Sequence, residues 1–332
     1  MYKRTTIKDI AKKLNISPST VSRALSDHPD INLETIKRVK TTALELEYFP
    51  NSVAQSLQKK HNNIIGVLVP EIKHDFFSSA IGGIESVVYN AGYAIIVTQS
   101  NESYEREVLN TSMLESNRVA GMIVSISENT INSGHFRALQ RRGTNIVFFD
   151  RVPSDIIASK VVCDDKKSAF NVVKFLINKG YKNIVHLGGP QTLLMSQERY
   201  IGYKEAMTQH FKDTPRVIFG GLHKMDGYNA MQIIKDDNIS CDCVFTVNDR
   251  VALGVYDFAN ENKIKIPDDL GVIGFHNNLY SSMLTPSLST IEQHSFDVGK
   301  AAAEIILKEI KSEKTRNEFI TINNSLIIRD SI

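Results

Sequence analysis

Apolar residues in the first 50 positions recur at the spacing of short helices. The first expected helix carries them on one face, at Ile7, Ile10, Ala11 and Leu14. Thr6 can cap this helix, and Ser17 can cap a second one, with Pro18 at its first position, where a missing N–H costs nothing. After a loop, Asn32 can cap a third helix. Two helices joined by a short turn, with a third beside them, predict a helix-turn-helix domain.

From residue 64 onwards, short apolar runs alternate with helical patterns. The runs cover residues 64–69, 94–98, 122–125, 146–149, 184–187, 244–247 and 272–275. The helical patterns between them include residues 80–90, 169–178, 200–209, 226–235 and 250–262. Buried strands that alternate with helices predict parallel sheets with right-handed crossovers. Because about 270 residues are too many for one such sheet, we expect two α/β lobes.

The composition narrows the class of protein. The chain has 332 residues, of which 42% are hydrophobic and 23% charged, close to the averages of soluble globular proteins. No apolar stretch approaches the roughly 20 residues that span a membrane, and residues 1–10 lack the apolar core of a signal peptide. The three cysteines, Cys163, Cys241 and Cys243, give no disulfide framework. These features predict a reduced, cytoplasmic compartment.

The net charge of +2 is unevenly distributed. Residues 1–60 carry 11 Lys and Arg against 6 Asp and Glu, whereas the remaining 272 residues carry 28 against 31. A basic head on a nearly neutral body predicts that only the head meets a polyanion. The alternative is that a small helical domain is basic for solubility.

The second expected helix presents a polar face with one arginine. This face holds Ser19, Thr20, Ser22, Arg23 and Ser26. Short hydroxyl side chains can approach phosphates closely, and an arginine can bond both O6 and N7 of guanine in the major groove. The alternative is that these residues form only the solvated face of a small helix.

Three segments near the N-terminus form a recognisable pattern. They read Thr-Ile-Lys-Asp-Ile-Ala at 6–11, Ser-Pro-Ser-Thr-Val-Ser-Arg-Ala-Leu at 17–25, and Tyr-Phe-Pro-Asn-Ser-Val-Ala-Gln-Ser-Leu at 48–57. Their order and spacing resemble the head and hinge helix of the lactose/galactose repressor family of bacterial transcriptional regulators. Further matches are Asp150-Arg151, Arg199 with Gly202, Asn248-Asp249 and Ile273-Gly274-Phe275. The resemblance therefore covers essentially the whole chain.

The resemblance implies a homodimer whose heads bind a near-palindromic operator in double-stranded DNA, each with its second helix in the major groove. The head residues expected to contact DNA are Thr6, Ser17, Pro18, Ser19, Thr20, Ser22 and Arg23. The residues expected to contact phosphates are Asn32, Thr35, Tyr48 and Asn51. Pro18 and Ser19 occupy the base-discriminating positions of the family. Because Pro18 has no side-chain donor, sequence reading there must rest on shape or apolar contact.

The expected hinge, residues 51–57, is a short segment with an apolar face. Helices under roughly 12 residues are marginal in water, so residues 51–57 are too short to be stable alone. Val53, Ala54 and Leu57 nevertheless lie on one face of such a helix. By the resemblance, Ala54 and Leu57 contact DNA, and Leu57 wedges into the minor groove, as apolar side chains do elsewhere. The alternative is an ordinary linker.

The expected fold is an all-α helix-turn-helix head with a hinge helix, followed by an α/β two-lobed body that resembles a type I periplasmic binding protein. The expected domains are the head at residues 1–50, the hinge and linker at 51–61, and an effector-binding and dimerisation body at 62–332. The first lobe is expected at about 62–161 and 292–319, and the second at about 162–291 and 320–332.

Polar and aromatic residues gather after the expected strands, where ligands of open parallel sheets bind. They are Phe76, Phe77, Ser125, Asp150, Asn248 and His276. Arg199, beside Tyr200 and Ile201 near the start of a helix, needs an anionic or hydroxylated partner. Polar groups with aromatic walls suit a polyhydroxylated ligand. In the family that the chain resembles, the matching positions hold a sugar or another small effector, so we expect no metal and no tightly bound cofactor.

Several of these residues have simpler interpretations. Asp150-Arg151 could form only an ion pair between lobes, and Phe76 and Phe77 could belong to the core. Asn248-Asp249 could form only a helix cap, with Asp249 as the more favoured cap residue. The remaining candidate, at position 276, departs from many relatives, which carry Asp there.

A histidine at position 276 has a chemistry of its own. It donates and accepts hydrogen bonds and titrates near neutral pH. His276 is compatible with an acidic ligand beside Arg199, and the alternative is a ring turned away from the cleft.

Signatures of enzymes are missing from the sequence. Gly188-Gly189-Pro190 is not a dinucleotide-binding loop, and there is no Walker A loop and no G-x-S-x-G elbow. We therefore expect a cytoplasmic DNA-binding regulator, a repressor of carbohydrate-use genes controlled by a sugar or sugar derivative between its lobes. With no leucine-heptad tail after the last expected strand, we expect a dimer.

Two alternatives remain. The first is a regulator of the same family whose co-effector is a phosphorylated carrier protein. The second is a sugar-binding protein of a transport system. The helix-turn-helix pattern in residues 1–60 argues against transport.

Overall fold

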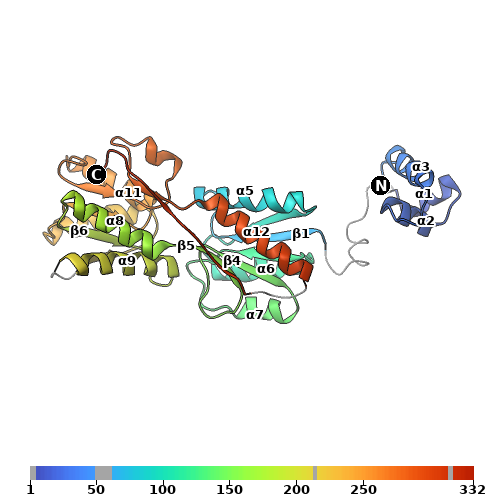
Figure 1. Cartoon of the computed structure of the whole chain (residues 1–332), viewed down its shortest axis with the longest axis horizontal. Coiled ribbons are helices and arrows are strands. Elements are labelled where there is room, and N and C mark those ends of the chain that lie inside the picture. Colours follow the sequence, from blue (N-terminus) through green and yellow to red (C-terminus); the bar gives the residue numbers. More distant parts are fainter. Residues whose placement is uncertain (1–4, 49–61, 212–214, 313–316) are drawn as a thin grey trace. The chain divides into compact units, whose positions relative to one another are not determined.

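The computed structural model of the chain describes residues 5–48, 62–211, 215–312 and 317–332 (Figure 1). It divides into two compact units, the head at Met1–Asn62 and the body at Asn63–Ile332. The hinge residues Asn51, Val53, Ala54 and Leu57 lie outside the described residues, so their expected roles remain predictions. No helix in the described part of the chain is long and apolar enough to cross a membrane.

The head consists of three helices, α1 (Ile7–Leu14), α2 (Pro18–Leu25) and α3 (Leu33–Glu45). They enclose a small apolar core of Ile10, Ala11, Val21, Ala24, Ile36, Val39 and Ala43. The helices begin where the sequence predicts. The Ser17 hydroxyl accepts a hydrogen bond from the Thr20 N–H at 3.1 Å, and the Asn32 side chain accepts one from the Thr35 N–H at 2.7 Å.

The first lobe of the body contains a parallel six-stranded sheet in the order β11-β5-β4-β3-β1-β2. The strands are β1 (Ile64–Val69), β2 (Ala94–Gln99), β3 (Gly121–Val124), β4 (Asn145–Phe149), β5 (Ser159–Cys163) and β11 (Phe319–Ile322). Helices α5 (Asp75–Asn90) and α12 (Ser295–Ser312) pack on one face. Helices α6 (Tyr104–Ser116) and α7 (Gly134–Arg141) pack on the other.

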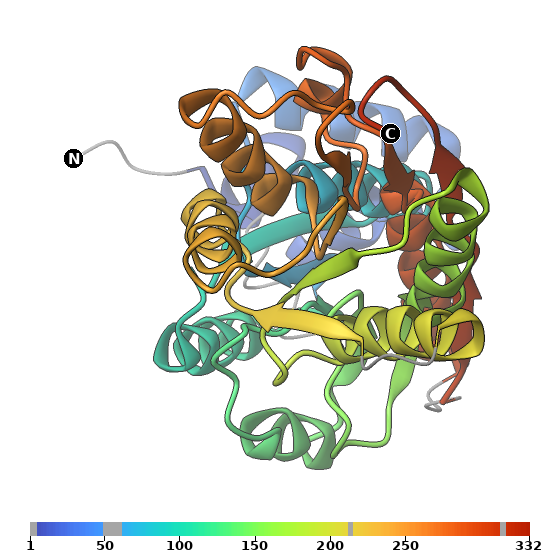
Figure 2. The ribbon, with the colours of Figure 1, turned by 90° about the vertical axis from the view of Figure 1, so that its left-hand side faces the viewer.

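The second lobe repeats this architecture around a parallel four-stranded sheet in the order β7-β6-β8-β9. The strands are β6 (Ile184–Gly188), β7 (Arg216–Phe219), β8 (Cys243–Thr246) and β9 (Gly271–Ile273). The green and yellow helices α8 (Asp165–Lys179) and α9 (Leu194–His210) lie to one side of the sheet (Figure 2). The gold and brown helices α10 (Lys224–Asp236) and α11 (Asp249–Glu261) lie to the other. A short 3-10 helix, η1 (Leu279–Ser282), follows β9.

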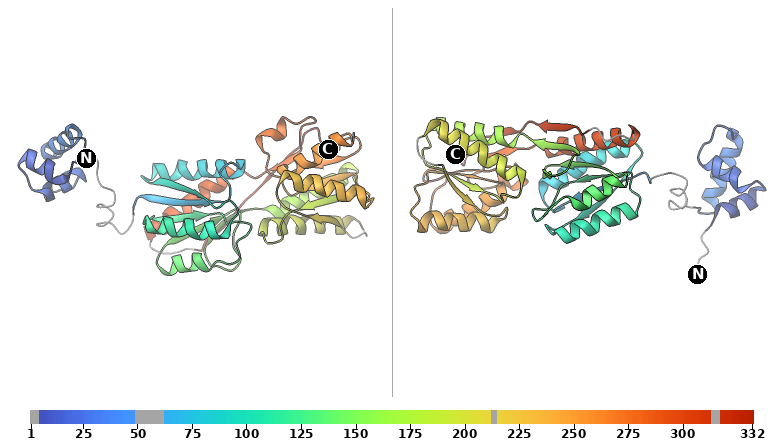
Figure 3. Two further views of the ribbon diagram at one scale, coloured as in Figure 1. Left: turned by 180° about the vertical axis from the view of Figure 1, so that it is seen from behind. Right: turned by 90° about the horizontal axis from the view of Figure 1, so that it is seen from below.

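The chain crosses between the lobes three times (Figure 3). It passes from β5 to α8, from β10 (Thr290–Glu292) to α12, and from β11 to β12 (Ser325–Ile327). Strands β10 and β12 pair with each other in an antiparallel ribbon. The crossings therefore bring three separate segments of sequence together beside the space between the lobes.

The lobe boundaries differ from the prediction. We expected residues 320–332 in the second lobe, but β11 pairs with β5 in the first sheet, with Ile322 opposite Cys163. Strands β11 and β12 are separated at Asn324, whose N–H donates to the Asp164 carboxylate at 2.8 Å. The first lobe thus extends through the ends of both β5 and β11.

Candidate functional site

The head exposes the polar face of α2. Ser17, Pro18, Ser19 and Arg23 are exposed, and Thr20 is half-buried. The Ser17 hydroxyl lies 2.6 Å from that of Ser19 and 2.8 Å from that of Thr20. The guanidinium of Arg23 has no partner among the described residues. The start of α2 is therefore a cluster of hydroxyls with one cation that can reach a ligand.

The other described head candidates lie on or beside the three helices. Ser22 is half-buried on α2, and Thr6 is exposed and donates its hydroxyl to the Asp9 carboxylate at 2.6 Å. Asn32 uses its side-chain oxygen to cap α3, which leaves its NH₂ group as a donor. Tyr48 packs partly against the head core, and burial raises the pKa of its hydroxyl, so it stays a neutral donor.

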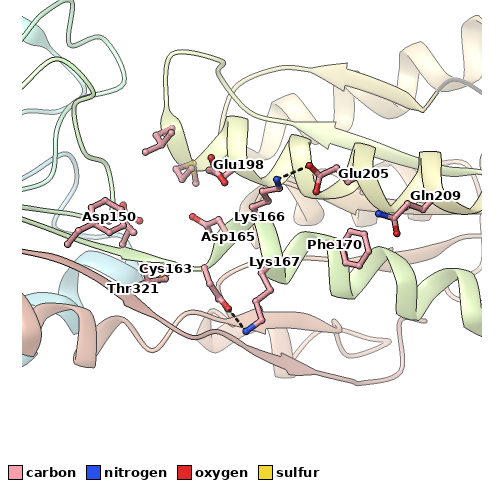
Figure 4. Close-up of a pocket in the computed structure, with 15 residues that line it drawn as sticks. Asp150, Cys163, Asp165, Lys166, Lys167, Phe170, Glu198, Glu205, Gln209 and Thr321 are labelled. Atoms are coloured by element: carbon pink, nitrogen blue, oxygen red, sulfur yellow. Dashed lines mark ion pairs between the residues drawn. The ribbon is translucent and has the colours of Figure 1, made fainter.

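Several hollows open on the described part of the body, and two of them share Asp150 and Met195 in their lining. The larger of these two, of about 580 Å³, adjoins the crossing from β5 to α8 and is shown in Figure 4. A volume of this size falls within the range of about 300–1,000 Å³ that is usual for small-molecule sites. The smaller one, of about 20 Å³, has room for about one water molecule.

The structure brings five of the seven candidate effector residues together. Those that line the smaller hollow are Phe76, Phe77, Asp150, Asn248 and His276. Phe76 and Phe77 also belong to the core of the first lobe, so the core interpretation holds for the same two side chains. Ser125 and Arg199 line neither hollow and are completely buried.

Asp150 lies in a strained turn directly after β4, with a φ of 57°. Its side chain is buried, and no described residue donates a hydrogen bond to its carboxylate. Burial raises the pKa of Asp150 to about 7, and the charges of Arg151 and Arg199 only partly oppose this. Strained backbone and an unbonded buried carboxyl are typical of binding sites.

Arg151 does not pair with Asp150, as one interpretation of the sequence expected. Its guanidinium instead donates to the Glu102 carboxylate at 2.7 Å and lies over the ring of Phe77. Both members of this ion pair belong to the first lobe, so it does not connect the lobes.

Arg199 has an internal partner that the sequence did not reveal. Its guanidinium donates to the Asp165 carboxylate at 3.0 and 3.2 Å and to the Val247 carbonyl at 2.6 Å. It also stacks on the Phe275 ring, with 3.7 Å from its central carbon to the ring centroid. The expected anionic partner of Arg199 is thus a residue of the protein itself.

Asn248, and not Asp249, caps α11. The Asn248 side chain accepts from the Val251 N–H at 2.8 Å and donates to the Leu222 carbonyl at 3.1 Å. Asp249 instead accepts from the hydroxyls of Ser281 and Thr290, both at 2.6 Å. The preference for Asp249 as the cap was wrong, because this carboxylate binds the segments after β9.

His276 faces the cleft, which excludes the alternative that it turns away. Its ring lies 5.0 Å from that of His74 and 5.6 Å from that of Phe76, measured between centroids. Burial, together with the charges of His74 and Arg199, holds the pKa of His276 well below its usual range. The expectation that His276 titrates near neutral pH is therefore wrong: an ordinary imidazole becomes a neutral one when it is fully buried.

Comparison with known proteins places this geometry in a family. The model of the lacI family of bacterial regulatory proteins matches residues 6–51, and that of the periplasmic binding protein-like domain matches residues 173–332. The chain is 30% identical over 335 residues to the HTH-type transcriptional repressor PurR of Vibrio campbellii, covering 98% of each chain. The chain belongs to the lacI family of bacterial regulatory proteins.

Two further matches extend over nearly the full length of this lacI-family chain. The ribose operon repressor of Halalkalibacterium halodurans is 28% identical over 327 residues, covering 98% of this chain and 97% of the relative. The structure of the lac repressor dimer bound to operator and the anti-inducer ONPF superposes with a TM-score of 0.88 at 22% identity, covering 99% of each chain.

Membership of the lacI family confirms the expected fold and the expected class of function. The protein is a DNA-binding transcriptional repressor with an effector-binding body, and it is not an enzyme. The transport alternative is not favoured, since the matched proteins are transcription regulators over their full length. The carrier-protein alternative, which is a regulator of the same family, is not favoured by these matches either.

Some residues of this lacI-family cleft were not predicted from the sequence. Glu71 of the first lobe accepts from Arg250 of the second at 2.9 Å, which links residues 179 positions apart. His74 contacts His276, and Glu198 lines the larger hollow beside Arg199 in α9. Only Glu198 had a signal in the sequence, its position next to a candidate; the ion pair and the histidine contact depend on how the lobes meet.

Proposed function

We propose that this repressor binds its operator as a homodimer through α2. A small molecule held between the two lobes raises or lowers its affinity for the operator. The observation that carries the proposal is the larger hollow beside Asp150. The backbone of Asp150 is strained, and its carboxyl group, which has no hydrogen bond, faces a space of small-molecule size. The ribose operon repressor among its relatives supports a sugar or sugar derivative as the effector, and carbohydrate-use genes as the target.

At the DNA, the proposal assigns base reading to the exposed residues at the start of α2 and to Arg23. A free guanidinium on this helix can donate two hydrogen bonds to guanine, which is the commonest specific contact in the major groove. The proposed DNA-contacting residues of the described head are Thr6, Ser17, Pro18, Ser19, Thr20, Ser22, Arg23, Asn32, Thr35 and Tyr48. Asn51, Ala54 and Leu57 remain proposed on the family resemblance alone.

In the cleft, the proposal separates residues that touch the effector from residues that position them. Asp150 lines both hollows and is proposed to touch the effector directly. His276, Phe76 and Phe77 line only the smaller hollow, and they are proposed to touch the part of the effector that reaches past Asp150 once that hollow widens. Asn248 holds the start of α11 at the cleft. Arg199 and Ser125 lie behind the surface, and Arg199 is proposed to position α8 and α9 through its bonds to Asp165 and Val247.

Control of operator binding would follow from a difference in the effector's affinity for two arrangements of the lobes. An effector that binds one arrangement of the lobes more tightly than another shifts the population toward it, with a coupling free energy of typically about 1–3 kcal/mol. The 20 Å³ hollow is too small for a sugar in the arrangement described here, so a ligand there requires side chains or lobes to move.

The test is footprinting of the DNA upstream of the protein's own gene, with and without a panel of sugars. We expect a protected near-palindromic site whose occupancy changes with one class of compound. Protection that no sugar alters would contradict effector control, and the absence of any preferred site would contradict the operator proposal.

A further inference from the structure

Carboxylates dominate the charged residues that line the larger hollow. Five carboxylates line it, those of Asp150, Asp164, Asp165, Glu198 and Glu205, against two lysines, Lys166 and Lys167. Apolar side chains complete the wall together with Cys163, Gln209 and Thr321. Carboxylates therefore outnumber the lysines in this lining before any ligand enters.

Three of the five carboxylates already have cationic partners. Glu205 accepts from Lys166 at 2.7 Å, and Asp165 accepts from Arg199 at 3.0 Å. Asp164 lies 3.8 Å from Lys167 and is also bonded by Ser168 and by the Asn324 N–H. Both lysines of the hollow are thus engaged, and Figure 4 shows the two lysine ion pairs as dashed lines.

Two carboxylates remain without such partners. Asp150 is only 9% exposed, and no hydrogen bond from a described residue reaches its side-chain oxygens. Glu198, half-buried on α9, likewise has neither an ion pair nor a hydrogen bond to any described side chain. In Figure 4, Asp150 approaches from the first lobe and Glu198 from the second.

An unpaired buried carboxylate is costly, and a ligand that supplies its missing donor gains the difference. An anionic ligand would meet two further negative charges with no free cation in the lining. A neutral sugar could bond to Asp150 in its protonated form, which the raised pKa of about 7 allows, but it would supply no cation to Glu198. A cation that also carries hydroxyls satisfies both requirements.

We propose that the effector is a protonated amino sugar whose ammonium group lies between the carboxylates of Asp150 and Glu198. This inference rests on the proposed function, because it names the chemical class that the same cleft selects. The ammonium group bridges the two lobes, and the apolar part of the sugar ring packs on Leu194 and Met195. The ligand would thereby favour one arrangement of the lobes over others.

The experiment is a thermal-shift and calorimetric titration of the full chain with matched sugars. The panel holds glucosamine, galactosamine and mannosamine. Each amine is compared with its N-acetylated form, with the neutral hexose that lacks the amino group, and with the 6-phosphate of that hexose. We expect one amine to raise the melting temperature and to bind, while its N-acetylated, neutral and phosphorylated counterparts bind at least about 10-fold more weakly.

Variants test the two carboxylates directly. Asp150→Asn and Glu198→Gln should each weaken binding of the amine by about 10- to 150-fold, since each removes a hydrogen bond to a charged group. Asp257→Asn is the matched control, because it removes the same charge from α11, outside the hollow, where Asp257 pairs with Lys224. Circular dichroism melting shows whether each variant is folded.

The outcomes separate the inference from the function on which it rests. A neutral or phosphorylated sugar that binds and shifts operator binding, without sensitivity to Asp150→Asn, overturns the amine and leaves effector control intact. An amine whose affinity is unchanged in both carboxylate variants overturns the site. A panel in which no sugar of any charge binds contradicts both the inference and the proposed sugar effector.

Discussion

At the scale of single residues, the cleft is defined by how burial changes ordinary side chains. Asp150 and His276 would both be charged or near titration in water, yet burial raises the pKa of Asp150 to about 7 and lowers that of His276 well below its usual range. Both residues also have a positive φ, of 57° and 125°. The cleft therefore stores unfavourable backbone and desolvation energy at the positions that face a ligand.

The raised pKa of Asp150 predicts how stability changes with pH. Asp150 keeps its proton up to about pH 7 in the folded state, whereas in the unfolded state it loses the proton near pH 4. The free energy of unfolding therefore falls as the pH rises from about 4 to about 7, by about 1.4 kcal/mol per unit of pKa difference. Asp150→Asn should remove this cost. We expect the variant to gain stability over the native chain, and to gain more at pH 8 than at pH 5, in urea unfolding. If the variant and the native chain differed in stability by the same amount at both pH values, a pKa near 7 would be contradicted. The charged neighbours of Asp150 are Glu102, Arg151, Asp165 and Arg199, and they are the same in both proteins.

Arg199 predicts a loss of folding stability when it is removed. Arg199→Ala leaves the Asp165 carboxylate buried without its cation, which typically costs about 3–5 kcal/mol. Denaturant unfolding should show this loss, and Arg199→Met combined with Asp165→Leu should recover most of it. A fully stable Arg199→Ala protein that fails only to bind a ligand would instead make Arg199 an effector contact.

At the scale of elements, α2 combines a structural cap with a proposed DNA contact. Ser17 caps the helix through the Thr20 N–H, and the same hydroxyl lies in the exposed cluster with Ser19. Capping is local, so its cost can be separated from that of DNA contact by choice of substituent.

The two roles of Ser17 are separated by a pair of substitutions. Ser17→Ala should destabilise the head by about 1 kcal/mol, because the cap is lost, whereas Ser17→Asp should keep the cap and the stability. Ser17→Asp should nevertheless weaken DNA binding strongly, since a carboxylate then faces phosphates. Melting and gel-shift assays on both variants decide, and unimpaired DNA binding by Ser17→Asp would exclude Ser17 from the interface.

Arg23 tests sequence reading by the same helix. Arg23→Ala should lose about 1–3 kcal/mol of operator affinity while binding to random DNA changes little, if the guanidinium reads a base. Gel-shift titrations at fixed salt on both DNAs measure the two losses. Equal weakening on operator and random DNA would make Arg23 a phosphate contact.

At the scale of the whole molecule, three polar contacts between described residues join the lobes directly, one of them a hydrogen bond from the Thr192 hydroxyl to the Glu128 carbonyl at 3.3 Å. The Glu71–Arg250 ion pair is partly buried, with side chains 17% and 26% exposed, and η1 adds a hydrogen bond from the Leu279 N–H to Asp75 at 3.3 Å. The covalent crossings lie beside the β10–β12 ribbon. The arrangement of the lobes thus depends on a small number of exchangeable contacts, as a two-state element requires.

A charge swap tests the ion pair as a latch between lobes. Glu71→Arg or Arg250→Glu alone places like charges together and should broaden the distance distribution between spin labels on the two lobes. The double swap should narrow it again, because the pair is restored in reverse. Identical distributions in all four proteins would show that the pair does not hold the lobes.

Much of the molecule was determined by sequence alone, because the deciding interactions are local. The caps at Ser17 and Asn32 act within three residues, and the apolar runs of the body predict its strands through the alternation of strand and helix. Local pattern also placed Phe76, Asp150 and His276 at one cleft, since the carboxyl ends of parallel strands meet at the same edge.

Only the tertiary structure decided what these residues touch. Arg199 pairs with a residue 34 positions away, Asn248 is bonded to Leu222, and Glu71 meets Arg250 across 179 positions. The same packing buries His276 and so removes its titration near neutral pH. Partner choice and pKa depend on which groups lie within a few ångströms and on how much water remains, and no periodicity in the chain encodes either quantity.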